Sequence, residues 1–256
     1  MTDDDHALAR DLAGQAGQRL LGLRAGGGEP DVLRKSGDRQ SHEFLAAQLA
    51  AARPGDWVLS EEAADNPRRR SADRVWIVDP LDGTREFGEP GRADWAVHVA
   101  LWERGAGLTA GAVALPARGE VLSTAQPPPG PADGAPQETS TRPIRVVVSR
   151  TRAPRFVQDI SGLLDIELVP LGSAGAKVAA VILGEADAYI HGGGFYEWDT
   201  AAPVAVARAA GLHASRIDGS ELAYNQADLL MPDILVCRPA LAVPLLQAIR
   251  EVTNAD

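Results

Sequence analysis

Two carboxylates follow one apolar, strand-like run closely enough to act on the same ligand. In "VWIVDPLDGTREF" (75–87) the β-branched run ends at Asp79, and Asp82 follows after Pro80 and Leu81. Side chains alternate faces along a strand, so these two acids converge only if the chain turns between them. Pro80 favours such a turn because it has no N–H to continue a ladder.

Gly83 and Thr84 come next and add backbone N–H groups beside the two acids. Carboxylates next to free N–H groups suit divalent cations together with a phosphate. The alternative is an Asx-type turn with solvated acids. Two further acids stand at similar places: Glu61 ends the run "DWVLSEE", and Asp199 in "EWDTAAP" opens a predicted helix. Acids at the ends of two predicted strands and at the start of one predicted helix together favour a metal site over an isolated turn.

Competing chemistries fail on spacing. An EF-hand needs oxygen ligands at alternate positions, but here those positions hold Asp79, Leu81 and Gly83. The five histidines lack zinc-site spacing, so we expect them to be structural or exposed. The sequence has no G-x-S-x-G elbow and no G-x-x-x-x-G-K-[ST] loop. A phospho-aspartate nucleophile has its acids two positions apart, whereas "DPLDGT" has them three apart, which favours metal-activated water.

Composition limits the function classes. The 256 residues are 45% hydrophobic and 23% charged, as in a globular protein, and the net charge is −10. That charge argues against a nucleic-acid polymer as partner, because phosphodiester chains call for a basic face. Cys237 is the only cysteine, which excludes a disulfide framework. No apolar run approaches the ~18–20 residues of a membrane span, and the N-terminus has no signal-peptide core, so we expect a cytoplasmic protein.

The elements that must position these acids change character along the chain. Helical spacing from Ala7 to Leu23, with cap candidates at 3–5 and a stop at 26–28, predicts a first helix; "SHEFLAAQLAA" (41–51) predicts a second, with Ser41 as its cap. The strand-like runs "DWVLSEE" (56–62) and "DRVWIVD" (73–79) are followed by short strands within 94–125, which predict an antiparallel meander. The Pro- and Gly-rich stretch 125–143 predicts a mobile loop at the boundary of two lobes, 1–140 and 141–256. Alternating strands and helices follow, ending in a helix over 239–253, which predicts a layered α/β second lobe.

Five stretches together resemble one known family. "SEEA", "DPLDGTREF" and "EWDTAAP" resemble the signatures of the inositol monophosphatase superfamily of magnesium-dependent, lithium-sensitive phosphatases. "GSAGAK" (172–177) and "IDGSELAYNQ" (217–226) look like its 3′(2′),5′-bisphosphate nucleotidase branch. The order and separation of the motifs match across almost the whole chain. The resemblance implies a layered αβαβα sugar-phosphatase-like fold of mixed α/β class.

The same resemblance implies a metal site built from the acids described above. Carboxylates and one backbone carbonyl (Leu81) would hold two or three magnesium ions, with Asp79 bridging two of them; these ligands are Glu61, Asp79, Leu81, Asp82 and Asp199.

The resemblance also assigns the catalytic groups. Gly83 and Thr84 would bind the phosphate, and the Thr84 hydroxyl would orient the attacking water together with Asp38, beside Glu61. Asp38 is matched by its position before the second predicted helix. The stretch 34–41 is shorter than is usual in the family and lacks its threonine, which leaves a third ion and lithium sensitivity open.

Substrate contacts are expected around this centre. Ser173 and Lys177 would reach the second phosphate or the ribose, sharing one face of a helix start. Glu197 either touches substrate or supports Asp199. The run Arg68–Arg70 reads as a solvated charge run. The predicted substrate-binding residues are Leu81, Asp82, Gly83, Thr84, Ser173, Lys177, Glu197 and Asp199.

The reaction that the resemblance implies is magnesium-dependent removal of the 3′-phosphate from adenosine 3′,5′-bisphosphate, giving AMP. One alternative is the same chemistry on inositol 1-phosphate or fructose 1,6-bisphosphate. Another is a non-catalytic metal- or nucleotide-binding regulator, although such a protein need not keep Thr84. A homodimer is left open.

Overall fold

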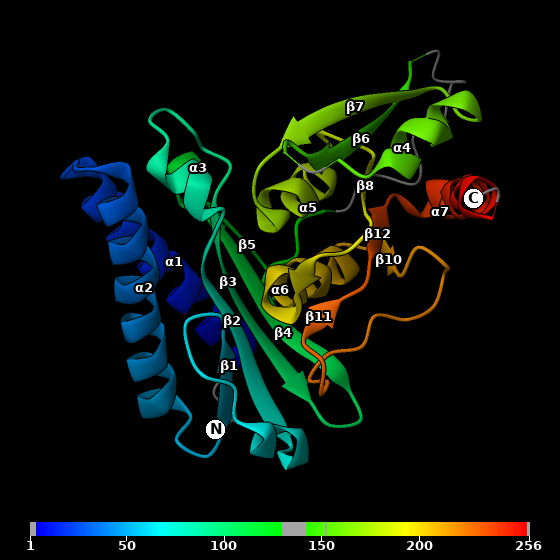
Figure 1. Cartoon of the computed structure of the whole chain (residues 1–256). Coiled ribbons are helices and arrows are strands. Elements are labelled where there is room, and N and C mark those ends of the chain that lie inside the picture. Colours follow the sequence, from blue (N-terminus) through cyan, green and yellow to red (C-terminus); the bar gives the residue numbers. More distant parts are fainter. Residues whose placement is uncertain (1–3, 130–141, 152, 255–256) are drawn as a thin grey trace.

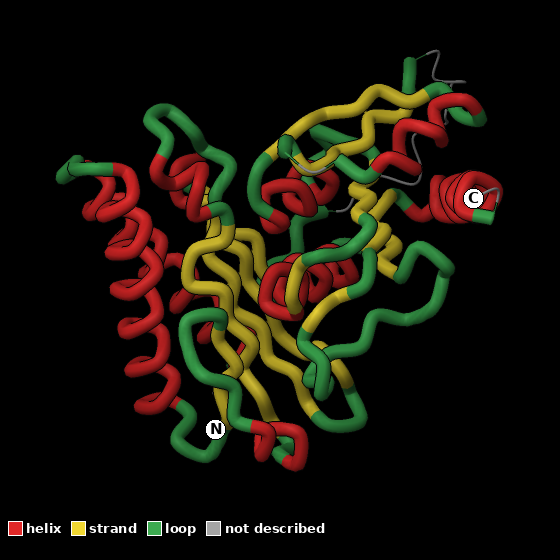
Figure 2. The backbone as a smooth tube through the Cα atoms, viewed as in Figure 1, coloured by secondary structure: helices red, strands yellow, loops and turns green. Residues whose placement is uncertain are grey.

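The computed structural model describes residues 4–129, 142–151 and 153–254. Two five-stranded sheets alternate with three layers of helices (Figures 1 and 2), which gives the αβαβα order expected from the sequence. The described helices are α1 (Asp5–Ala25), α2 (Pro30–Ala52), α3 (Thr84–Gly88), α4 (Arg155–Asp159), α5 (Ala174–Ile182), α6 (Glu197–Ala209) and α7 (Pro239–Thr253), with 3-10 turns η1 (Pro67–Ser71), η2 (Pro116–Arg118) and η3 (Ile160–Gly162).

The first sheet has the order β1-β2-β3-β4-β5. β1 runs parallel to β2, and the remaining neighbours are antiparallel, so the predicted meander is confirmed from β2 onward. Its strands are β1 (Trp57–Ser60), β2 (Arg74–Asp82), β3 (Ala96–Glu103), β4 (Gly107–Leu115) and β5 (Glu120–Ser123).

The second sheet has the order β10-β12-β8-β6-β7, and a two-stranded ribbon pairs β9 with β11. β6 lies parallel to β7 and β8, whereas β12 lies antiparallel to β8 and β10. The strands are β6 (Ile144–Ser149), β7 (Ile166–Leu171), β8 (Ala188–His191), β9 (Phe195–Tyr196), β10 (His213–Ser215), β11 (Leu230–Met231) and β12 (Ile234–Cys237).

Three apolar cores hold the layers together. Helices α1 and α2 cover the outer face of the first sheet, and α4 and α7 cover the outer face of the second. Between the sheets lie α5 and α6, whose apolar residues join one core with the inner faces of both (Figure 1). Within β12, Val236 faces this central core while Leu235 and Cys237 face α7, as the alternation of a strand requires. The site must therefore form where the central helices meet a sheet end.

Helix α2 differs from expectation. It begins at Pro30 rather than near Ser41, so the stretch 34–41 is helical and Ser41 lies buried inside it. Proline fits the first turn of a helix, and the sequence that follows has no further breaker strong enough to end it. The Ser41 hydroxyl donates to the Pro80 carbonyl at 2.7 Å, so this face of α2 packs on the end of β2. The prediction of Ser41 as a cap is wrong, because its hydroxyl serves a tertiary contact.

The expected boundary loop includes residues 130–141, which lie outside the described residues. Residues before it supply the first sheet and residues after it the second, while α5 and α6 pack against both. We keep the division into 1–140 and 141–256 as a proposal. Among the described residues, every helix is too short or too polar to cross a bilayer.

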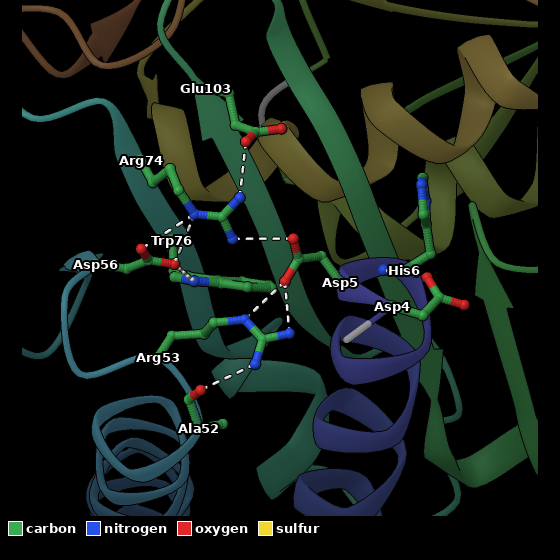
Figure 3. A network of polar contacts seen from close by, with 9 residues as sticks. All are labelled: Asp4, Asp5, His6, Ala52, Arg53, Asp56, Arg74, Trp76 and Glu103. Atoms are coloured by element: carbon green, nitrogen blue, oxygen red, sulfur yellow. Dashed lines mark hydrogen bonds and ion pairs between the residues drawn. The ribbon is translucent and has the colours of Figure 1, made fainter. Parts of the chain in front are cut away.

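A polar network ties α1 and α2 to the start of β2 (Figure 3). The Arg74 guanidinium pairs with Asp5 at the start of α1, with Asp56 and with Glu103. Arg53 at the end of α2 shares Asp5. This network lies at the strand end opposite Asp79 and Asp82, so it anchors the scaffold rather than the site.

Candidate active site

A β-bulge places Asp79 and Asp82 on one face of β2. Asp79 lies opposite His98 and Asp82 opposite Ala96, so three steps on β2 face two steps on β3. The extra residue reverses the alternation: Leu81 turns into the outer core under α1 and α2, and Asp82 turns inward. The convergence predicted for these two acids is the result of this bulge.

The inward acids meet a third carboxylate from the central layer. One oxygen each from Asp79, Asp82 and Asp199 lies within 4.8 Å of the others. Asp199 belongs to the first turn of α6, where its Oδ2 accepts a hydrogen bond from the Tyr196 N–H at 2.6 Å. The acids of the strand end and the helix start are therefore brought together, as the sequence predicted.

The carboxylates of this cluster repel one another, and a bound cation would relieve that repulsion. Burial and the charges of Glu61, Asp82 and Asp199 raise the pKa of Asp79 well above its usual range. Burial and the charge of Asp199 raise the pKa of Glu61 to about 8, although part of the side chain faces solvent. Uncompensated acids at close range disfavour their own ionisation, and oxygen ligands suit Mg²⁺. The donor set fits the magnesium site predicted from the sequence.

Asp82 is held by α5. Its Oδ2 accepts hydrogen bonds from the Ser173 hydroxyl at 2.5 Å and the Gly175 N–H at 2.7 Å. His98 Nε2 lies 3.3 Å from the same oxygen, while His98 Nδ1 is 3.1 Å from the Trp198 carbonyl. His98 is buried, as expected for a structural histidine, but its place beside a site carboxylate was not predicted.

Thr84 stands between the metal cluster and helix α2. Gly83 adopts φ +81°, and α3 begins at Thr84, so the N–H groups of its first turn have no partner within the helix. The Thr84 hydroxyl lies 3.0 Å from the Leu81 carbonyl and 3.2 Å from Asp38 Oδ1. Burial and the charge of Glu62 raise the pKa of Asp38 to about 6. Asp38 was expected just before the second helix, but it lies inside α2. Its predicted pairing with Thr84 is nevertheless present.

A pocket of about 540 Å³ opens beside these groups. Asp82, Gly83, Thr84 and Asp199 line one part of it, and Ser173 and Lys177 belong to its wall. The Lys177 ammonium lies 3.3 Å from the Gly172 carbonyl and 5.4 Å from the centre of the Tyr189 ring. Burial lowers the pKa of Lys177, against the charges of Asp82 and Asp199. Ser173 also caps α5 through its hydroxyl, and its contact with substrate stays a prediction.

Arg150 is a pocket residue that the sequence analysis missed. It follows β6 and donates through Nη2 to Glu86 Oε1 at 2.6 Å and to Glu89 Oε1 at 3.1 Å. Its signal was a lone cation after the strand "IRVVVS", which by itself says nothing of a pocket. These bonds join α3 to the end of β6, and the two carboxylates offset the charge of Arg150 in the pocket wall.

Glu197 and Arg69 are buried charged residues whose side chains bond to other segments of the chain. Both carboxylate oxygens of Glu197 accept backbone N–H groups, from Asn225 and Gln226, at 2.7 Å each. These bonds support the start of α6, which is the second of the two roles expected for Glu197. Arg69 is 1% exposed and pairs with Asp65. The interpretation of Arg68–Arg70 as a solvated charge run is therefore wrong for Arg69.

Comparison with known proteins agrees with this geometry. The sequence profile described as "Inositol monophosphatase family" matches residues 9–254. The chain belongs to the inositol monophosphatase family. A relative from Mycobacterium tuberculosis (strain CDC 1551 / Oshkosh), named 3′-phosphoadenosine 5′-phosphate phosphatase, is 52% identical over 242 residues, covering 92% of this chain and 90% of the relative. The 3′(2′),5′-bisphosphate nucleotidase CysQ of Escherichia coli (strain K12) is 32% identical, covering 84% and 91%.

Solved structures of the inositol monophosphatase family share the fold. The crystal structure of CysQ from Bacteroides thetaiotaomicron superposes with a TM-score of 0.77 at 27% identity, covering 93% of this chain and 98% of that one. Inositol monophosphatase II from Staphylococcus aureus MSSA476 gives 0.76 at 22% identity, covering 97% and 93%. The layered fold expected from the sequence is confirmed.

Proposed function

We propose that this chain is a magnesium-dependent phosphatase that removes the 3′-phosphate of adenosine 3′,5′-bisphosphate, giving AMP and phosphate. The observation that carries the proposal is the pocket in which Asp82 and Asp199, clustered with the buried Asp79, adjoin Gly83 and Thr84. Relatives at about half identity bear the name of the same activity. Lys177 in the pocket wall favours a substrate with a second phosphate over inositol 1-phosphate.

The residues of the chain divide the work of phosphate transfer to water. Glu61, Asp79, Asp82, Asp199 and the Leu81 carbonyl would hold the cations, which lower the pKa of the attacking water and neutralise charge on the phosphate. The N–H groups of Gly83 and of the first turn of α3 would donate hydrogen bonds to phosphate oxygens. When the Thr84 hydroxyl donates to Asp38 or to the Leu81 carbonyl, its oxygen keeps lone pairs free to accept a hydrogen bond from the attacking water and so orient it.

Finer features belong to the same proposal. Two or three magnesium ions bind, lithium inhibits, and the protein acts in the cytoplasm. The support is the oxygen-only donor set and the family resemblance; Asp38 beside Thr84 favours a third ion, because it adds a carboxylate next to the cluster.

The direct test is kcat/KM for adenosine 3′,5′-bisphosphate, inositol 1-phosphate and fructose 1,6-bisphosphate, each with magnesium and with added lithium. We expect the nucleotide to be preferred at least tenfold. A preference for either other substrate would assign the chain to that chemistry, and no turnover of any would favour the non-catalytic regulator.

Removing a site carboxylate tests the metal assignment. Asp82→Ala or Asp199→Ala should abolish phosphate release because the cation site loses a ligand, while circular dichroism shows the fold intact. Asp73→Ala is the matched control, since Asp73 is an exposed acid paired only at the surface with Arg104 among its described contacts. Near-normal turnover in either site variant would contradict the assignment.

The pocket cation Lys177 tests the substrate class. Lys177→Ala should lower kcat/KM for the nucleotide bisphosphate at least tenfold more than for inositol 1-phosphate, because the latter has no second phosphate for the ammonium to meet. Steady-state kinetics on both substrates measure this ratio. Equal losses would remove Lys177 from substrate selection.

A further inference from the structure

Two of the four site carboxylates stand outside the sheet that holds the other two. Asp79 and Asp82 belong to β2, which is paired on both sides by β1 and β3. Glu61 stands on the segment between β1 and η1, and Asp199 stands at the start of α6. A metal site needs its ligands held in fixed mutual positions, so something must fix these two segments relative to each other.

Arg69 closes the segment that carries Glu61. The Arg69 side chain in η1 is buried, and it reaches back along its own segment to Asp65. Nε donates to Asp65 Oδ1 at 2.6 Å and Nη2 donates to Asp65 Oδ2 at 3.2 Å. This two-pronged pair gathers the chain four residues after Glu61 into a compact loop.

The same guanidinium reaches across to the segment before β11. Nη1 donates to Asn225 Oδ1 at 2.5 Å, and Nη2 donates to the Gln226 carbonyl at 2.8 Å. Asn225 Nδ2 lies 3.4 Å from the Arg69 carbonyl in return. One planar group thus satisfies acceptors on two segments that are more than 150 residues apart in the sequence.

The segment before β11 is in turn fixed to the start of α6. The N–H groups of Asn225 and Gln226 donate to the two carboxylate oxygens of Glu197, which is fully buried two residues before Asp199. The Glu197 N–H donates to the Leu229 carbonyl at 3.0 Å. A continuous path of hydrogen bonds therefore runs from Asp65, near Glu61, to the helix turn that carries Asp199.

We propose that Arg69 is a positioning residue that fixes the Glu61 segment against the start of α6 and thereby sets the affinity of the site for divalent cations. The inference rests on the metal-dependent site proposed above. Lysine could not replace the arginine, because an ammonium lacks the planar fork that serves Asp65, Asn225 and Gln226 together. Partners that orient metal ligands without binding the metal change affinity by about 10–100-fold when removed.

The test measures metal binding directly on the full chain. Isothermal titration with Mn²⁺ and with Mg²⁺ should show Arg69→Gln binding about 10–100-fold more weakly than the wild type. The Mg²⁺ concentration for half-maximal phosphate release should rise by a similar factor, while KM for the substrate at saturating Mg²⁺ stays unchanged. Arg70→Gln, an exposed neighbour in the same turn, is the matched control and should bind as the wild type does.

A second variant keeps the test decisive if Arg69→Gln does not fold. Asn225 adopts φ +62°, which glycine tolerates, so Asn225→Gly removes the Arg69 contact and leaves the backbone bonds to Glu197. We expect about tenfold weaker metal binding. Wild-type affinity in the folded variants, even with a lower melting temperature, would overturn this inference alone. Absence of divalent-cation binding by the wild type would overturn the proposed function and this inference with it.

Discussion

The Thr84 hydroxyl is a small group with a demanding position. It lies within hydrogen-bonding distance of both Asp38 Oδ1 and the Leu81 carbonyl, so its proton has an acceptor and its oxygen faces the site. Thr84→Val keeps the shape but removes the hydroxyl and should lower kcat about 10²–10⁴-fold with little change in KM. Thr84→Ser is the control and should keep most of the activity. A Thr84→Val enzyme within a few fold of wild type in a phosphate-release assay would exclude the hydroxyl from water orientation.

At this scale the sequence predicted the residues whose chemistry is local and missed those defined by distant contacts. Asp79, Asp82 and Thr84 lie within six residues, and two carboxylates followed by a hydroxyl at this spacing indicate a metal and phosphate site. Arg69 reads like its exposed neighbours, because its partners Asn225 and Gln226 lie far along the chain. Burial of a charge depends on which segments fold over it, and no local pattern records that.

Two of the three glycines of helix α1 have opposite roles. A Cβ at Gly17 would lie 2.7 Å from the Pro116 side chain, whereas a Cβ at Gly22 would meet nothing within 4 Å. Gly22→Ala should raise the free energy of unfolding by about 0.5–1 kcal/mol, because alanine loses less backbone freedom in a helix. Gly17→Ala should lower it by about 1–3 kcal/mol through overpacking against η2. Urea denaturation of both variants measures the difference, and a change of the same sign in both would contradict this packing of α1.

Element positions were predictable where periodicity and caps agree, as for α7, whose bounds match the expected 239–253. The start of α2 was not, since Ser41 was expected to cap the helix, whereas Gly37 and Ser41 both lie inside it. Both are small because the helix lies close to its neighbours: a Cβ at Gly37 would lie 2.9 Å from Leu81 and Phe87, and Ser41 bonds to Pro80. A tight helix–strand contact and a loop use the same small residues, so the sequence alone could not separate them.

The molecule as a whole places mutually repelling acids between its two sheets, and this governs stability when no cation is bound. Burial and neighbouring charge raise the pKa of Glu61 to about 8 and raise that of Asp79. In the chelated protein the folded state therefore binds more protons than the unfolded chain above about pH 5, and stability falls as pH rises toward 8. Bound magnesium replaces those protons and adds stability of about 2.7 kcal/mol at 100 times its dissociation constant.

We therefore expect the melting temperature in EDTA to drop between pH 6 and pH 8, and the increment produced by magnesium to grow over the same interval. Differential scanning fluorimetry at both pH values, with EDTA or with magnesium, measures it. Glu61→Gln is the matched variant: without the carboxyl that titrates near pH 8, its melting temperature in EDTA should depend less on pH than that of the wild type. The contradicting result is a chelated wild-type protein that becomes more stable from pH 6 to pH 8, by the same amount as the magnesium-bound form. Protons and cations would then not compete for the same carboxylates, and the acids would not repel one another.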